Sequence, residues 1–228
     1  MKLVLTCEHA GNQVPAEFHY LFDRDPAILG THRGYDPGAH DLFIYLKDLA
    51  AFSRAHMESR LLIELNRSMH HPDLFSEFTR PLPMETRKEL INTYYIPYRG
   101  EIEDVISRLV QKGEEVIHLS IHSFTPELNG ELRNADIGLL YDPSRKDEKD
   151  WSMCMKNELL ERDGSLRLRA NYPYRGTSDG FTTCLRKKFH ENYIGIEIEV
   201  NQKFAGGNKM DQKLKTIIFS TLEKLLKI

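Results

Sequence analysis

Apolar residues along the chain recur with two periods, and this pattern predicts strands that alternate with helices. Short aliphatic runs predict strands at residues 3–7, 61–65, 116–121, 137–141 and 194–200. Longer stretches carry apolar residues three or four positions apart, which predicts helices at residues 41–54, 101–112, 151–162 and 209–227. Such alternation is typical of an α/β domain in which helices flank a mixed or mostly parallel central sheet.

Polar residues gather where several of these strands should end or a helix should begin. They lie in the segments CEHAGNQVP (7–15), YDPGAHD (35–41), SIHSF (120–124) and IEIEVNQ (196–202). In the last segment, Glu197 and Glu199 share one face of the strand, because alternate side chains of a strand point the same way. Ligand sites of α/β folds lie at the carboxyl ends of strands, so we expect these segments to meet in one site.

The residue types in these segments suit metal-dependent hydrolysis as well as structural roles. Taken singly, Asp36 is typical of a helix cap, and His122 of a hydrogen-bonded core residue. Taken together, two histidines and a carboxylate are the usual protein ligands of a catalytic zinc ion that keeps one position open. A free glutamate beside them could then act as general base toward water. The ligands would be spread over the chain without diagnostic spacing, so the pattern leaves both explanations open.

Two further segments have the chemistry of a binding site for a carboxylate. SRLLIELNRS (59–68) places Arg60 before a predicted strand and Asn66-Arg67 after it. Arginine binds carboxylates through two parallel hydrogen bonds, and a neighbouring asparagine adds donors. The loop NYPYRGTSDGF (171–181) could wall a substrate pocket with Asn171, Tyr174, Arg175 and Asp179. The alternatives are a surface salt bridge for Arg60 and ordinary turn formation for the loop.

Composition restricts the class of protein further. The 228 residues suit a single domain spanning residues 1–228, and the net charge of −3 gives no field that would recruit nucleic acid or an anionic membrane. Cys7, Cys154 and Cys184 form no CxxC pair, which favours a reducing, cytoplasmic location. No apolar run approaches the roughly 18 residues of a transmembrane helix, so neither membrane insertion nor secretion is expected.

Six segments together resemble the N-formylglutamate amidohydrolase family. In chain order they are CEHAGNQVP, YDPGAHDL, SRLLIELNR, SIHSF, NYPYRGTSDGFT and IGIEIEVNQ, which extend over nearly the whole chain. The resemblance implies one amidohydrolase domain with a mixed, mostly parallel sheet flanked by helices, like the zinc carboxypeptidases and the phosphorylase-like folds. In that wider group two histidines and a carboxylate hold zinc, an Asn-Arg pair binds the substrate carboxylate, and a glutamate late in the chain activates water.

Applied to this sequence, the resemblance implies that His9 and His122 bind the metal and that Asn66 and Arg67 bind the substrate carboxylate. Glu199 matches the general base best, and Glu197 is the alternative. The expected cofactor is Zn²⁺ or another divalent metal such as Co²⁺, because the same nitrogen and oxygen ligands bind several such ions.

The third metal ligand departs from the pattern of the carboxypeptidases. Those enzymes use a glutamate three residues after the first histidine, and this sequence has Asn12 there, whose amide is a poor zinc ligand. The carboxylate must come from elsewhere, from Asp36 or from Glu8. Adjacent residues of an extended chain point in opposite directions, so Glu8 shares a metal with His9 only if the chain bends sharply between them. We therefore expect Asp36 to be the third ligand.

The expected function is metal-dependent hydrolysis of the amide of an N-acyl amino acid, such as N-formylglutamate. Two alternatives remain at this point. The enzyme could be a zinc exopeptidase that acts on short peptides, or the chain could be a catalytically lapsed domain that binds acidic ligands. The expected partner in each case is a small molecule or short peptide, and the sequence predicts no oligomeric state.

Overall fold

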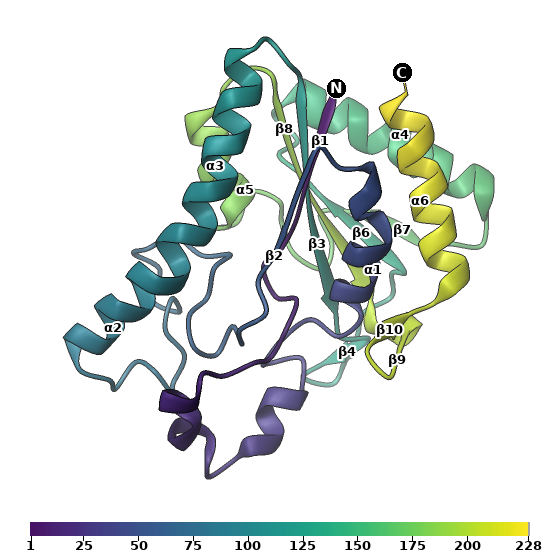
Figure 1. Ribbon diagram of the computed structural model, residues 1–228. Coiled ribbons are helices and arrows are strands. Elements are labelled where there is room, and N and C mark those ends of the chain that lie inside the picture. Colours follow the sequence, from purple (N-terminus) through teal and green to yellow (C-terminus); the bar gives the residue numbers. More distant parts are fainter. Residues whose placement is uncertain (228) are drawn as a thin grey trace.

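The computed structural model describes residues 1–227 and is built on a six-stranded sheet in the order β2-β1-β3-β8-β6-β7 (Figure 1). The strands are β1 (Lys2–Cys7), β2 (Phe52–Ala55), β3 (Val116–Phe124), β6 (Ile137–Leu140), β7 (Leu168–Ala170) and β8 (Tyr193–Asn201). The four strands from β2 to β8 are parallel, whereas β6 runs antiparallel to β8 and parallel to β7. The prediction of a mixed, mostly parallel sheet flanked by helices is confirmed.

Helices cover both faces of this sheet (Figure 1). They are α1 (Ala39–Leu46), α2 (Met84–Leu90), α3 (Ile96–Gln111), α4 (Lys146–Arg162), α5 (Phe181–Lys188) and α6 (Gln212–Leu226). Helices α3 and α5 pack on one face, and α1, α4 and α6 pack on the other. Two short hairpins, β4 (Glu127–Leu128) with β5 (Glu131–Leu132) and β9 (Ala205–Gly206) with β10 (Lys209–Met210), lie outside the sheet. Within residues 1–227, no helix has the length and apolar character needed to span a bilayer.

Burial of apolar side chains on both faces fixes the central strands. Every residue of β3 and of β8 is buried, as expected for strands that are covered on both sides. Ile102 and Ile106 of α3 belong to the core on one face, and Met155 of α4 belongs to the core on the other. Full burial of such a side chain contributes roughly 1.5–3 kcal/mol, so the two cores hold the ends of β3 and β8 in fixed positions.

The apolar run at residues 61–65 was predicted to be a strand, and that prediction is wrong. Its leucines and isoleucine are buried in the core, but the backbone forms turns, with the amide of Leu62 donating to the carbonyl of Ser59 and the amide of Glu64 to that of Leu74. An apolar run reports burial and cannot by itself distinguish a strand from a buried turn.

Other elements differ from the predictions in extent. The helix predicted at 41–54 ends at Leu46, and the last three residues of the predicted range belong to the edge strand β2 (Phe52–Ala55) instead. Helices α2 and α5 and the short strand β7 were not predicted, because each is too brief to repeat an apolar period more than once. Helix α5 begins inside the segment 171–181 that was predicted to be a loop.

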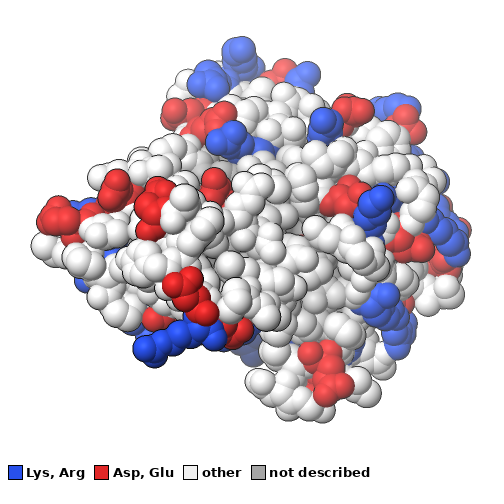
Figure 2. All heavy atoms as spheres, turned by 60° about the horizontal axis from the view of Figure 1, so that its bottom comes forward, with Lys and Arg blue, Asp and Glu red and all other residues white. Residues whose placement is uncertain are grey.

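Charged side chains of both signs are scattered over the face that comes forward when the bottom of Figure 1 is turned toward the viewer (Figure 2). The centre of this face is largely uncharged. Among residues 1–227, this face therefore presents no broad region of a single sign.

Candidate functional site

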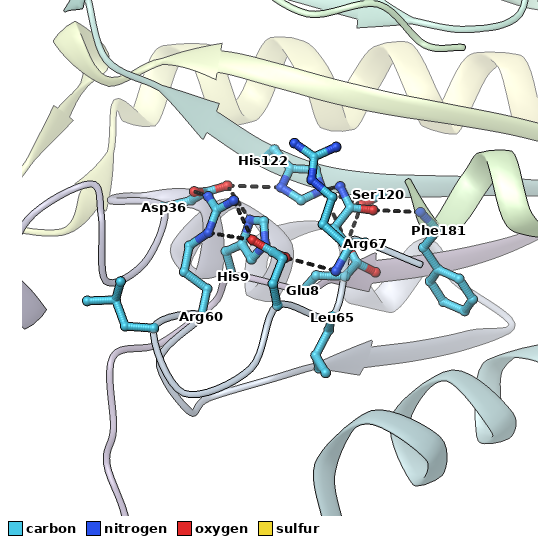
Figure 3. A network of polar contacts seen from close by, with 12 residues as sticks. Glu8, His9, Asp36, Arg60, Leu65, Arg67, Ser120, His122 and Phe181 are labelled. Carbon is cyan, nitrogen blue, oxygen red and sulfur yellow. Dashed lines mark hydrogen bonds and ion pairs between the residues drawn. The ribbon is translucent and has the colours of Figure 1, made fainter. Parts of the chain in front are cut away.

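Three segments bring two histidines and one aspartate together at the carboxyl ends of β1 and β3, and Figure 3 shows these three side chains side by side. His9 follows β1, His122 lies near the end of β3, and Asp36 precedes α1, where its amide donates to the carbonyl of His9 at 3.0 Å. Oδ2 of Asp36 lies 3.3 Å from Nδ1 of His9 and 2.9 Å from Nδ1 of His122. All three side chains are buried, and they could hold a metal ion.

Asp36 and the two histidines shift one another's pKa values, upward for the histidines and downward for Asp36. Burial alone would raise the pKa of Asp36, but contacts with His9 and His122 hold it below its ordinary value. Burial would lower the pKa of His122, but the Asp36 and Glu8 carboxylates hold it well above its ordinary value. Two imidazole nitrogens and a carboxylate oxygen are a donor set that suits zinc and related divalent ions. Such an ion would replace the protons on the histidines, so its affinity should fall as the pH falls.

Glu64 is a member of the site that the sequence did not predict. Its Oε1 lies 2.6 Å from Nε2 of His9 and accepts the amide of Asn66 at 2.9 Å, while Nε of Arg60 donates to its Oε2 at 2.8 Å. Burial opposes its ionisation, but Arg60 and His9 hold the pKa of Glu64 well below its ordinary value. The available signal was a lone acidic residue within the apolar run 61–65.

Glu8 lies apart from Asp36, on the far side of His122. Its Oε2 is 3.2 Å from Nε2 of His122 and accepts a short hydrogen bond from the hydroxyl of Ser120, while the hydroxyl of Tyr98 donates to its Oε1 at 3.2 Å. Burial would raise the pKa of Glu8, but hydrogen bonds from His122 and Ser120 keep it below its ordinary value. Asp36, and not Glu8, therefore lies in the group that could hold a metal.

Glu199 faces the cavity with a free carboxylate oxygen. In the register of β3 with β8 it is the direct partner of His122. Its Oε2 is buried and has no hydrogen-bond partner among residues 1–227. Burial, followed by repulsion from Asp36 and Glu197, raises the pKa of Glu199 to about 7. A carboxylate with a pKa near neutrality can both take and return a proton.

Glu197 also lines the cavity, but Oε1 of its carboxylate accepts a hydrogen bond from the hydroxyl of Thr182 at 2.7 Å.

Beside Glu199, the partner strand β6 carries Gly138. A Cβ atom there would lie 1.8 Å from the carbonyl oxygen of Tyr172 and 3.4 Å from Cβ of Glu199. Glycine is therefore required at position 138 for the loop after β7 to approach the strand that carries Glu199.

The cavity has a volume of about 200 Å³ and collects most of the residues predicted to act on a substrate. Its lining includes His9, Asp36, Arg60, Asn66, Arg67, His122, Tyr174, Arg175, Asp179, Glu197 and Glu199. The guanidinium of Arg60 is bound to acidic partners, Oε2 of Glu64 at 2.5 Å and Oδ1 of Asp36 at 3.4 Å. Arg60 therefore has less capacity for an external carboxylate than the other two arginines.

Asn66 and Arg67 are held from several directions. Oδ1 of Asn66 accepts the amide of Phe181 at 2.8 Å, and the guanidinium of Arg67 donates a short hydrogen bond to the carbonyl of Asp179. The backbone carbonyl of Arg67 accepts hydrogen bonds from the hydroxyl of Tyr95, which precedes α3, at 2.7 Å and from the guanidinium of Arg99 in α3 at 2.8 Å. Arg67 has no carboxylate partner among residues 1–227, so its remaining donors are available at the cavity.

Asn171 was predicted to bind the substrate, but it lies outside the cavity lining. Its Oδ1 accepts the amides of Tyr141 and Gly176, at 3.1 and 2.8 Å, because a short amide side chain is suited to bonding nearby backbone in a turn. It thereby shapes the loop that carries Tyr174 and Arg175. Within residues 1–227, the guanidinium of Arg175 has no hydrogen bond or ion pair, and this side chain is exposed at the cavity.

Comparison with known proteins identifies the relatives of this chain. The profile of the family described as N-formylglutamate amidohydrolase matches residues 1–205. A gene product from Agrobacterium tumefaciens has a similar structure, with a TM-score of 0.84 at 22% identity over 99% of this chain and 90% of that chain. An N-formylglutamate amidohydrolase from Ralstonia eutropha also has a similar structure, with a TM-score of 0.72 at 18% identity over 100% of this chain and 94% of that chain.

At these identities the two structures show a shared fold alone. A metallo-carboxypeptidase from Burkholderia cenocepacia is a distant neighbour, with a TM-score of 0.43 at 9% identity over 99% of this chain and 57% of that chain, and supports no further conclusion. Among proteins with curated descriptions, none matches the chain.

Proposed function

The chain belongs to the N-formylglutamate amidohydrolase family, and from this membership and the chemistry of the cavity we propose that it hydrolyses the amide bond of an N-acyl amino acid such as N-formylglutamate. The reaction consumes one water molecule and releases a carboxylic acid and a free amino acid. We further propose that the cofactor is zinc and that His9, Asp36 and His122 are its ligands.

One observation carries this proposal. Oε2 of Glu199 is buried and unpartnered at the wall of the cavity that holds the His9, Asp36 and His122 cluster. A buried carboxylate oxygen without a partner costs free energy, so its retention points to a ligand or a reacting group that it meets. A water molecule in the cavity that donates a hydrogen bond to Glu199 would meet that requirement.

The residues then have complementary roles. A bound zinc ion would polarise the acyl oxygen and make water more acidic. Glu199 would take a proton from the attacking water and return it to the nitrogen of the leaving amine. Because the raised pKa of Glu199 lies near neutrality, both transfers are feasible at the same pH. Glu197, whose carboxylate accepts the hydroxyl of Thr182, lies beside it, and repulsion from Glu197 is one of the causes that raise the pKa of Glu199.

Two arginines would bind the carboxylates of the substrate. Arg67 is held in place by its neighbours, and Arg175 has no acidic partner among residues 1–227. An acidic amino acid carries two carboxylates, which would match these two guanidinium groups. Because they line the same cavity as His9, Asp36, His122 and Glu199, they would orient the amide toward these residues, and such orientation is itself a large part of catalysis.

The proposal is tested by removing metal with a chelator, reloading the protein with zinc or cobalt, and assaying N-formyl and N-acetyl amino acids. We expect close to one metal ion per chain and hydrolysis of N-formylglutamate by the loaded protein only. A loaded protein that leaves every N-acyl amino acid and peptide intact would contradict hydrolysis. A chain that takes up no metal after reconstitution would favour the lapsed binding domain.

A second cavity favours one alternative, the cleavage of longer substrates. It has a volume of about 260 Å³ and shares Asp36, Arg60 and Tyr174 with the first cavity. Phe124 and Leu128 add apolar surface to its wall. This space would accept an acyl group larger than formyl, or a short peptide. Faster hydrolysis of dipeptides than of N-formylglutamate would support an exopeptidase.

A further inference from the structure

The two histidines of the cluster each direct their two ring nitrogens at different groups. Both Nδ1 atoms face Asp36, at 3.3 Å for His9 and 2.9 Å for His122. Both Nε2 atoms point away from Asp36, each toward its own buried glutamate. The three groups that could hold a metal therefore meet on the Nδ1 side, and the Nε2 side is where the rings are oriented.

Behind His9, the contact is direct. Nε2 lies 2.6 Å from Oε1 of Glu64, which also accepts the amide of Asn66. The positive charge of Arg60 lies against the second oxygen of Glu64, at 2.8 Å from Nε. Glu64 is therefore fixed on several sides, and the charge of Arg60 balances its own.

Behind His122, the contact runs through a serine. Nε2 lies 2.8 Å from the hydroxyl oxygen of Ser120, which donates a short hydrogen bond to Glu8, and Glu8 itself is 3.2 Å from Nε2. The hydroxyl of Tyr98 holds the other oxygen of Glu8. His122 therefore resembles His9: in both rings, the nitrogen that faces away from Asp36 has a carboxylate as its partner.

We propose that Glu64 and Glu8 are positioning residues of the metal site. Glu64 accepts a hydrogen bond from Nε2–H of His9. On the other ring, Nε2–H of His122 donates to the hydroxyl oxygen of Ser120, whose own proton goes to Glu8, and Glu8 also lies directly beside this Nε2–H. Each neutral ring is thereby held in the tautomer whose Nδ1 lone pair is free for a metal, and each becomes a stronger donor. This inference rests on the proposed function, because it requires the cluster to bind a metal.

The test compares zinc affinity, measured by competition with a chromogenic chelator, in the intact protein and in Glu64→Gln and Glu8→Gln. Loss of an outer carboxylate should weaken zinc binding by roughly 10- to 100-fold. Glu58→Gln is the matched control, because Glu58 lies 3.3 Å from His56, a histidine outside the cavity, and zinc affinity should be unchanged. Ser120→Ala, which removes only the relay, should weaken binding less than Glu8→Gln and serves in its place if that variant does not fold.

Imidazole ¹⁵N correlation spectra of the zinc-loaded protein give a second readout that needs no variant. We expect a proton on Nε2 and the metal on Nδ1 for both histidines. Coordination through Nε2, or wild-type zinc affinity in folded Glu64→Gln, would overturn the positioning role while leaving the proposed function intact. Failure of the intact protein to bind zinc would instead refute the proposed function, and the positioning role with it.

Discussion

Two histidines lie four residues apart on the same face of β3, and their surroundings are opposite in character. His118 contacts two neutral hydroxyls, of Thr6 and Tyr193, each at 2.9 Å, and burial lowers its pKa to about 4. For His122 burial acts in the same direction, but the carboxylates of Asp36 and Glu8 outweigh it and raise its pKa. Both rings are almost completely buried, so their partners, and not their burial, decide which one suits a metal.

The neighbouring strand β8 also differs at the positions opposite these two histidines. Opposite His118, β8 carries Gly195, whereas opposite His122 it carries Glu199. Opposite His118, β8 therefore carries no charged side chain of its own, whereas its carboxyl end carries Glu197 and Glu199. Charged groups are costly to bury without partners, so such a concentration is expected only where a ligand compensates for it.

Replacement of each histidine should give the largest contrast. His122→Ala removes one of the three proposed metal ligands. Zinc affinity should therefore fall more than 100-fold, which is about the most that loss of an outer-shell partner costs, and activity should disappear. His118→Gln should retain one zinc ion per chain, because it touches no member of the cluster. Metal analysis after dialysis measures both, and loss of zinc from folded His118→Gln would show that the two ends of the strand are not independent.

Replacement of the glutamates on β8 should separate metal binding from chemistry. Glu199→Gln should retain zinc and lose roughly 10²–10⁴-fold in kcat, because it removes the proposed proton acceptor. Glu197→Gln should retain more activity, since its carboxylate accepts a hydrogen bond from Thr182. Steady-state kinetics on the zinc-loaded variants measures this. The reverse order of activities would assign the general base to Glu197.

The buried carboxylate of Glu199 should destabilise the metal-free protein at high pH. Its pKa is about 7 in the folded state against 4.5 ordinarily, so the stability it contributes is present below pH 4.5 and is lost as the pH rises through 7. Metal-free Glu199→Gln should therefore exceed the intact protein by about 3 kcal/mol in unfolding free energy at pH 8, with no difference below pH 4.5. Urea unfolding in the presence of a chelator measures this, and equal stabilities at pH 8 would contradict it.

The smallest effect is expected at the exposed rim of the charged end. Arg175→Ala should raise KM for N-formylglutamate about tenfold, at the lower end of the range for a hydrogen bond to a charged group because the side chain is exposed. The value of kcat should change little. Ser178→Ala, which lies in the same cavity wall without a charge, is the control. A fall in kcat with an unchanged KM would place Arg175 in the chemical step instead.

The sequence predicts the residues at the carboxyl ends of strands well, because strand order in a parallel sheet brings such ends together. His9, His122 and Glu199 each follow or end an apolar run that does form a strand. The choice of Asp36 over Glu8 followed from the opposite directions of adjacent side chains. In the structure Asp36 lies between the Nδ1 atoms, and Glu8 lies on the far side of His122.

Contacts made by irregular segments could not be predicted in this way. Glu64 lies in the run 61–65, which was predicted to be a strand. A strand fixes which face of the sheet a side chain points to, but it does not identify the residue that the side chain contacts. In the turns that form instead, it reaches His9 and Arg60. Asn171 was predicted to bind substrate from its place in a polar loop, and only the folded chain places its side chain on the backbone of that loop. Such contacts depend on turn geometry, which has no hydrophobic period.

The parallel pairing of β3 with β8 also has a consequence for motion. His122 and Glu199 occupy facing positions on two central strands that are buried along their whole length. Amide hydrogens in such strands usually exchange with solvent only when the whole domain opens, whereas loop amides exchange by local opening. The distance between this histidine and this glutamate should therefore persist through local fluctuations of the loop that carries Arg175.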